Sequence, residues 1–280
     1  MSIVIALKVG DGVVLGADSA TALVSMDGYA ENVYFSGEKV LNLVPGLPIG
    51  MLTHGLGGLE NRSTTRLARD LAKELGSPGS PARLNPATYT MEQVTARVRD
   101  FFRPRYLRRF MATGDPAPMG FVLAGYSTGA SSAEVWSIRL AGTAVEGPTM
   151  ELGREDTDGL YWEGEGKALS RLLRGAAPEL KNRFPELNIP AEELARRLDA
   201  STPVWHAAMP MQDAIDLVRY LAEVVIGYIR FTPGALMVAP PIDIAAITAH
   251  DGFQWVARKQ WFDPALNLSR AAARTEDGAW

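Results

Sequence analysis

The chemistry that this sequence offers begins at Ser2, directly behind the initiator methionine. We expect Met1 to be removed before so small a residue, which would leave a hydroxyl and a free α-amine together on Ser2. An α-amine has a pKa of about 8, so a useful fraction is neutral at pH 7 and can accept the hydroxyl proton. Serine at position 2 is common, so position alone does not establish a nucleophile.

The rest of the composition removes most other catalytic classes. The 280 residues contain no cysteine, which excludes disulfides, thiolate metal sites, iron–sulfur clusters and a cysteine nucleophile. The three histidines, His54, His206 and His250, lie far apart without an HExxH-type spacing, so we expect no metal and no cofactor. A net charge of -4 provides no polybasic footprint, so we expect no nucleic-acid partner.

The apolar segments indicate a cytoplasmic protein without a membrane partner. No apolar run reaches the length of a membrane span. Lys8 interrupts the first apolar stretch, which therefore does not resemble a cleavable signal sequence. The absence of cysteine also fits a reducing compartment.

Alternating β-branched and aliphatic residues predict several hairpins. The first joins residues 3–9 to 13–18 around Gly10-Asp11-Gly12, so a strand starts almost at the first residue. A second joins 39–44 to 48–53 around Pro45-Gly46. Further strands are predicted at 120–126, 133–138, 160–162, 242–248 and 253–256.

Apolar residues at helical spacing predict helices between these hairpins. The predicted ranges are 60–75, 90–111, 167–173, 192–198 and 211–229. Arg103-Pro104-Arg105 predicts a kink or a break in the second helix. The surrounding arginines fit either an anion site or, as is usual for such a run, a solvated face or subunit contact.

Strands and helices occur in blocks rather than in strict alternation along the chain. This order favours an α+β protein with two antiparallel sheets and helices on the outside, a four-layer αββα sandwich.

Five segments, in this order, resemble proteasome β-type subunits, including the divergent bacterial homologues. Ser2-Ile3-Val4 with the stretch DGVVLGADSAT at 11–21 is similar to the start of that family. Similar segments follow along most of the chain, at the lysine-bearing strand, the oxyanion-hole turn, the "AGY" strand and the closing hairpin: Glu38-Lys39-Val40, 53–58, 122–126 and 241–252. The resemblance implies the fold of the N-terminal nucleophile hydrolases.

The resemblance also implies roles for individual residues. Ser2 would be the nucleophile, with its own α-amine as base, and Asp18 and Lys39 would hold charge around it. Gly55 would offer its backbone N–H to the oxyanion of a tetrahedral intermediate. Thr21 would contact substrate.

The sequence departs from the family pattern at four positions. The arginine that commonly follows the family's Asp-Ser pair is absent, because Ala20 follows Asp18-Ser19 here. Glu165 stands in Gly164-Glu165-Gly166 where the family has a serine, and it would either hydrogen-bond the α-amine or act as a different acid or base. Ile229 stands where the family has an aspartate, and Thr232 stands at a second serine position.

By the same resemblance, residues 1–263 form a single domain with insertions near 76–118 and 176–210, followed by a tail at 264–280. The implied activity is a proteasome-like protease acting on peptides or unfolded protein in a homo-oligomeric ring or stacked rings. A partner ATPase cannot be inferred from the sequence. Two alternatives remain open: a catalytically inactive ring subunit, and an amidase or acyltransferase acting on a small metabolite.

Overall fold

Side chains along the first strand, β1 (Ile3–Val9), alternate between two buried surfaces. Ile3, Ile5 and Leu7 pack with apolar residues of two helices, whereas Val4 and Ala6 pack with residues of a second sheet. Successive side chains of a strand point to opposite faces, so a strand that is buried throughout has a layer on each side. The first seven strand residues therefore already require a layered structure.

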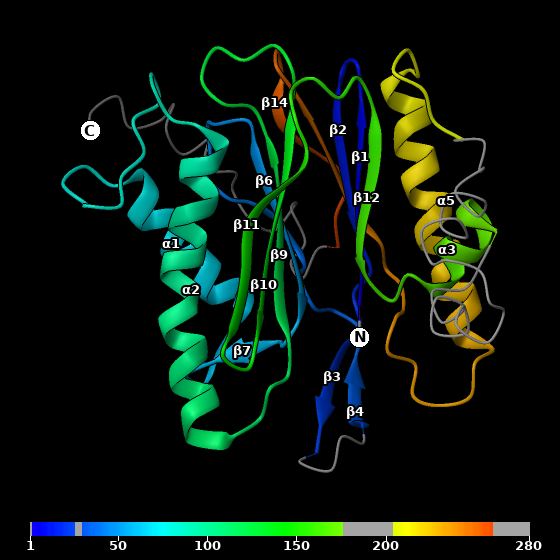
Figure 1. Cartoon of the computed structure of the whole chain (residues 1–280). Helices are drawn as coiled ribbons and strands as arrows, with labels where there is room; N and C mark the ends of the chain where they lie inside the picture. The colour runs from blue at the N-terminus through cyan, green and yellow to red at the C-terminus, as the bar shows by residue number, and fades with distance from the viewer. Residues whose placement is uncertain (1, 26–29, 176–203, 260–280) are drawn as a thin grey trace, which may run out of the picture.

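The computed structural model describes residues 2–25, 30–175 and 204–259 (Figure 1). One five-stranded antiparallel sheet has the order β12-β1-β2-β13-β14, and the other has the order β11-β10-β9-β6-β5. Two small hairpins, β3-β4 and β7-β8, stand outside these sheets. The remaining strands are β2 (Gly12–Ala17), β3 (Thr21–Val24), β4 (Ala30–Tyr34), β5 (Val40–Asn42), β6 (Ile49–Gly55), β7 (Gly58–Leu59), β8 (Arg62–Ser63), β9 (Met119–Gly125), β10 (Glu134–Ala141), β11 (Ala144–Leu152), β12 (Gly159–Gly164), β13 (Asp243–Thr248) and β14 (Gly252–Ala257).

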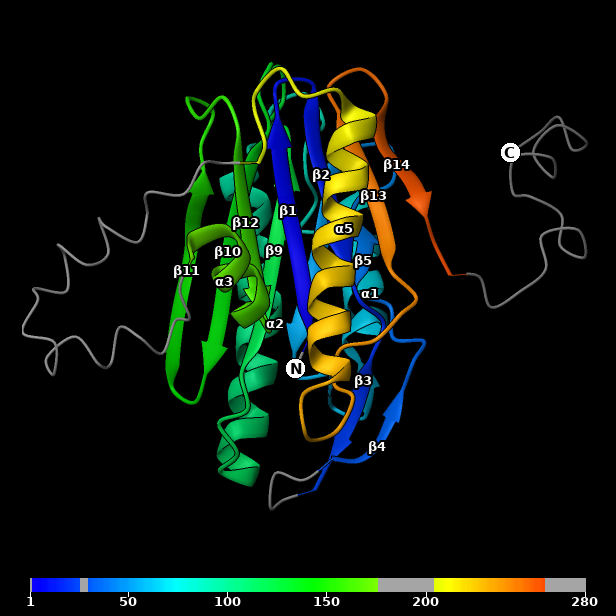
Figure 2. The same cartoon turned by 90° about the vertical axis from the view of Figure 1, so that its right-hand side faces the viewer.

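The described helices cover the two outer faces in pairs. Helices α1 (Thr64–Gly76) and α2 (Met91–Thr113) pack on the sheet that contains β6 and β9. Helices α3 (Lys167–Arg174) and α5 (Met211–Arg230) pack on the sheet that contains β1, and both views show a pair on each side (Figures 1 and 2). The predicted αββα sandwich is confirmed.

Helix α2 differs from its prediction because it is continuous through Pro104. Of the predicted kink or break at this position, the break is wrong, and the helix continues to Thr113, where Gly114 caps it in the left-handed conformation. Tyr106, two residues after the proline, is 1% exposed, and its hydroxyl donates to the carbonyl of Ala117 at 2.9 Å. Packing against β10 and β11 therefore outweighs the lost main-chain hydrogen bond. The region expected as an insertion at 76–118 contains this helix.

Strands β3, β4, β7, β8 and β11 are absent from the sequence prediction, and β8 lies inside the predicted helix 60–75, which begins only at Thr64. Most described side chains of β11 are half-buried or exposed, and its edge position gives it one sheet neighbour. Hydrophobic alternation is weak where neither face is fully buried, so such strands carry little signal.

Some predictions lie outside the described residues. These are the helix at 192–198, the tail at 264–280, Met1, and most of the insertion near 176–210. Within the described ranges, no helix is both long enough and apolar enough to cross a membrane.

Candidate functional site

Ser2 lies at the entry to β1, and its main chain is held by the end of β12. By the alternation of β1, Ser2 shares the face of Val4, which looks toward the second sheet. Its carbonyl accepts a hydrogen bond from the backbone N–H of Glu165 at 2.7 Å. Ser2 is only 4% exposed. The candidate nucleophile is thus fixed between the two sheets.

Asp18, at the end of β2, connects the start of β1 to Lys39. Its Oδ1 accepts from the N–H of Ile3 at 3.0 Å and from Lys39 Nζ at 2.6 Å. Its Oδ2 accepts from the N–H of Ala20 at 2.9 Å and of Ala239 at 3.2 Å. A carboxylate with four donors is held in one orientation, and it is fully buried.

Lys39 precedes β5 and reaches Asp18 across the space between the sheets. Burial is the main cause that lowers its pKa, the Asp18 carboxylate opposes this shift, and the Lys259 ammonium adds to it. Lys39 therefore releases a proton more readily than an exposed lysine.

Strand β6 connects Gly55 to the Lys39 main chain, and Thr21 packs next to the turn that follows Gly55. The N–H of Thr53 donates to the carbonyl of Lys39 at 2.9 Å, and Gly55 follows two residues later at the end of β6. Gly55 has φ +79°, and a Cβ there would lie 2.2 Å from the carbonyl oxygen of Pro118, so the position requires glycine. The methyl of Thr21 lies next to Gly57, where a Cβ would be 3.4 Å away.

Three of the departures from the family pattern, Glu165, Thr232 and Ile229, occupy different places. Glu165 is half-buried and contacts the site through its backbone N–H, which donates to the carbonyl of Ser2. The Thr232 hydroxyl donates to the carbonyl of Tyr228 at 2.9 Å, and the residue is exposed. Ile229 packs in the apolar core under α5. Thr232 thus supplies a hydrogen-bond donor to a carbonyl in the last turn of α5.

A polar cluster between the sheets was not anticipated from the sequence. His54 packs its ring against Gly120, where a Cβ would lie 2.0 Å from Nε2. Burial lowers the pKa of His54 to about 4, so the imidazole is neutral at pH 7. Glu163, opposite Val4 on β12, accepts from Arg139 and from the Tyr161 hydroxyl. The alternation of β6, with Leu52 inward, is the signal that could have placed His54 on this inner face.

Three arginines that follow Pro104 have carboxylate partners. Arg105 and Arg108 pair with Glu60, and Arg109 pairs with Asp115. This pairing favours a solvated face over an anion site. Among the residues that the structure describes, no group of three or more carboxylates and imidazoles could hold a metal ion.

Solved structures show which known fold this arrangement matches. Anbu, described as an ancestral beta-subunit, from Yersinia bercovieri aligns with a TM-score of 0.55 and 14% identity, over 91% of this chain and 87% of that one. The chain has the fold of the Anbu proteins. Anbu from Pseudomonas aeruginosa, solved as a helical assembly of the Anbu complex, gives a TM-score of 0.57 and 15% identity, over 98% and 91%. Anbu from Hyphomicrobium sp. strain MC1 aligns with a TM-score of 0.53 and 14% identity, over 92% of this chain and 86% of that one.

The Anbu similarity confirms the expected proteasome-like sandwich. It does not assign the chain to the proteasome β-type subunits themselves, because at these identities the similarity establishes the fold alone. No protein-family model matches the sequence, and no curated protein matches it either.

Proposed function

We propose that this protein is an N-terminal-serine hydrolase of peptide or amide bonds, with Ser2 as nucleophile after removal of Met1. The observation that carries the proposal is the sharing of Asp18 Oδ1 between the N–H of Ile3 and the ammonium of Lys39. This oxygen links the residue after the nucleophile to a buried cation. The charge pair is therefore held one residue from Ser2.

In the proposed reaction the α-amine of Ser2 accepts the hydroxyl proton while Oγ attacks the substrate carbonyl carbon. The carbonyl π electrons move to oxygen, and the backbone N–H of Gly55 would donate to that oxyanion. The C–N bond then breaks, the leaving amine takes the proton from the α-ammonium, and an acyl ester remains on Ser2. Water, deprotonated by the α-amine, hydrolyses the ester and restores the hydroxyl.

Asp18 and Lys39 would assist without bonding covalently to the substrate. A positive charge near the α-amine disfavours its protonation and stabilises a developing alkoxide. Asp18 keeps the Lys39 ammonium in place at 2.6 Å. Thr21, on the strand that leaves the site, would contact the substrate chain.

We also propose self-assembly into a ring, stacked ring or related homo-oligomer in the cytoplasm, acting on peptides or unfolded protein. The helical assembly formed by the Pseudomonas aeruginosa Anbu complex supports self-association of this fold. Enclosure in an assembly would restrict access to extended chains.

The decisive experiment combines intact mass with covalent labelling. We expect the purified protein to lack Met1 and to gain one sulfonyl group at Ser2 on treatment with phenylmethanesulfonyl fluoride. Ser2→Ala should gain none, whereas the control Ser131→Ala, altered at an exposed turn, should label like the wild type. Retained Met1 with unlabelled Ser2 would favour a catalytically inactive ring subunit. Hydrolysis of small amides but not of peptide libraries would favour an amidase or acyltransferase.

A further inference from the structure

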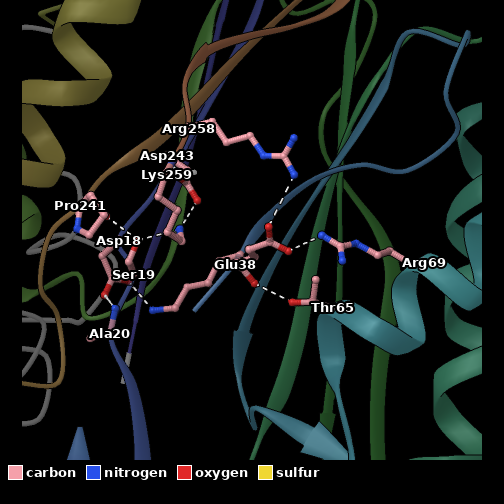
Figure 3. Close-up of polar contacts among 11 residues, drawn as sticks. Asp18, Ser19, Ala20, Glu38, Thr65, Arg69, Pro241, Asp243, Arg258 and Lys259 are labelled. Atoms are coloured by element: carbon pink, nitrogen blue, oxygen red, sulfur yellow. Dashed lines mark hydrogen bonds and ion pairs between the residues drawn. The ribbon is translucent and has the colours of Figure 1, made fainter. Parts of the chain in front are cut away.

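Two consecutive cations just after β14 contact the chain neighbours of the Asp18–Lys39 pair. Lys259 Nζ donates to the Ser19 hydroxyl at 2.8 Å, and Ser19 directly follows Asp18. Arg258 lies 3.5 Å from Glu38, which directly precedes Lys39. Figure 3 shows both side chains approaching the site from the same strand end.

Ser19 is held through every polar group that it has. Its N–H donates to the carbonyl of Ala239 at 2.9 Å, and its carbonyl accepts from the N–H of Gly37 at 2.9 Å. Its hydroxyl donates to the carbonyl of Pro241 at 2.5 Å, so the hydroxyl oxygen accepts from Lys259. Ser19 therefore fixes the turn that carries the Asp18 carboxylate.

Lys259 is itself anchored by Asp243 at the start of β13. Its backbone N–H donates to Asp243 Oδ1 at 2.9 Å, and its ammonium pairs with Oδ2. The Asp243 side chain is 2% exposed and that of Lys259 is 12% exposed. A buried ion pair contributes little net stability, so its presence is better explained by the geometry that it enforces.

The two ion pairs are joined through adjacent residues of one turn. Asp18 binds Lys39, and Ser19 binds Lys259. The two ammonium groups therefore approach the same turn from opposite sheets. The charged and titratable groups that act on Lys39 are Asp18 and Lys259, and Lys39 in turn acts on His54.

We propose that Lys259 is a positioning residue of the candidate site, which orients the Asp18–Ser19 turn and places a second positive charge beside Lys39. This inference rests on the proposed function for its catalytic consequence. The second charge opposes protonation of Lys39 and of the nearby α-amine, so the amine acts as a base at lower pH. The Lys259 charge lowers the pKa of Lys39 by less than burial does, and the direction agrees with this arrangement.

The test measures the rate at which phenylmethanesulfonyl fluoride labels Ser2 from pH 5 to pH 9. Lys259→Met removes the charge and the donor, whereas Lys259→Arg keeps the charge. Ser19→Ala removes the acceptor with the charge intact, and Lys73→Met, at an exposed position of α1, is the matched control. Hydrogen exchange of the Ala20 and Ala239 amides, both bound to Asp18, is followed in parallel.

We expect Lys259→Met to label about tenfold more slowly at pH 7, with the rising limb of the profile moved to higher pH. In Lys259→Arg the rising limb of the pH profile should lie at the wild-type position. Ser19→Ala should slow labelling without moving this limb, and Lys73→Met should match the wild type. Exchange of both amides should accelerate in Lys259→Met and Ser19→Ala. A Lys259→Met profile identical to that of the wild type, with unchanged exchange, would overturn the proposal.

Failure of the proposed function gives a different result. A wild-type protein that never carries the sulfonyl group on Ser2 overturns the hydrolase proposal and the catalytic consequence of Lys259. The exchange rates then still decide positioning, because unchanged exchange in Lys259→Met rejects it and faster exchange supports it. If Lys259→Met does not fold, Lys259→Gln removes the charge while keeping a hydrogen-bond donor, and Ser19→Ala tests positioning through the same two exchange rates.

Discussion

A Cβ atom on Gly164 would lie 1.9 Å from the carbonyl oxygen of Ser2, so the residue facing the candidate nucleophile has no room for a side chain. Gly164 also has φ +93°, a conformation that other residues rarely adopt. The end of β12 can therefore approach Ser2 only through glycine. This contact and the hydrogen bond from Glu165 to Ser2 determine the position of the nucleophile.

We predict that Gly164→Ala lowers the free energy of unfolding by about 3 kcal/mol and slows sulfonylation of Ser2 at least tenfold. Backbone strain and the displaced Ser2 carbonyl both contribute. Gly46→Ala is the control, because Gly46 has φ +90° but no atom within 4 Å of the added Cβ. Urea denaturation of Gly46→Ala should show a free energy of unfolding lowered by about 1 kcal/mol. Sulfonylation of Ser2 in this variant should match the wild type. Equal losses of stability and of labelling rate in the two variants would mean that the contact with Ser2 is unimportant.

Removing the Asp18 charge should destabilise the fold strongly. Asp18→Asn leaves the Lys39 ammonium buried without its carboxylate, and we expect a loss of about 3 to 5 kcal/mol. Asp70→Asn, which breaks the pairing of Asp70 with the exposed Arg66, should cost less than about 1 kcal/mol. Chemical denaturation of the two variants at pH 7 tests the difference. Similar costs would show that Lys39 does not depend on Asp18.

His54 should make the folded state sensitive to mild acid. Its pKa is lowered from 6.5 to about 4, chiefly by burial, so between these values the unfolded chain binds a proton that the folded protein excludes. Stability therefore rises with pH across this window, and acidification from pH 6.5 to pH 4 removes about 3 kcal/mol through this residue. Glu163 opposes the shift, whereas Arg139 and Lys39 add to it.

The comparison that isolates this effect is the wild type against His54→Gln, unfolded by urea at several pH values from 4 to 7. The carboxylates are the same in both proteins, so their contributions to the pH dependence of stability cancel in the difference. We expect the stability difference to change with pH in favour of the variant under acid conditions. A constant difference over the whole range would contradict an imidazole that stays neutral in the folded protein.

Pro104 should reduce the stability of α2 despite its continuous helical conformation. Pro104 lacks an N–H and cannot complete the hydrogen bond to the preceding turn, so Pro104→Ala should raise the free energy of unfolding by about 1 to 3 kcal/mol. Pro45→Ala, in the exposed turn before β6, should leave stability unchanged or slightly lower it. Thermal unfolding is the measurement. A lower melting temperature for Pro104→Ala would show that the proline itself positions Tyr106.

The sequence by itself determined the strands whose faces are both buried, and with them the layered architecture. Apart from Lys8, β1 and β2 contain only apolar residues and glycine. Joined by an Asp-Gly turn, these strands can bury both of their faces only inside a sandwich. Short-range spacing also placed α1, α3 and α5 close to their observed bounds, because amphipathic periodicity is local. Ser2, Asp18 and Lys39 were named as site residues from the family resemblance, and the structure brings Asp18 to both Lys39 and the residue after Ser2.

Only the tertiary structure decided which distant groups surround that pair. Lys259 lies 240 residues from Ser19 in the chain, and no periodicity relates the two positions. The orientation of His54 remained open in the sequence, since a strand-end histidine can face solvent or the core, and packing against Gly120 settled it. Continuity through Pro104 was likewise decided by the sheet beneath α2. Such contacts depend on how sheets and helices pack rather than on neighbouring residues, so local patterns do not contain them.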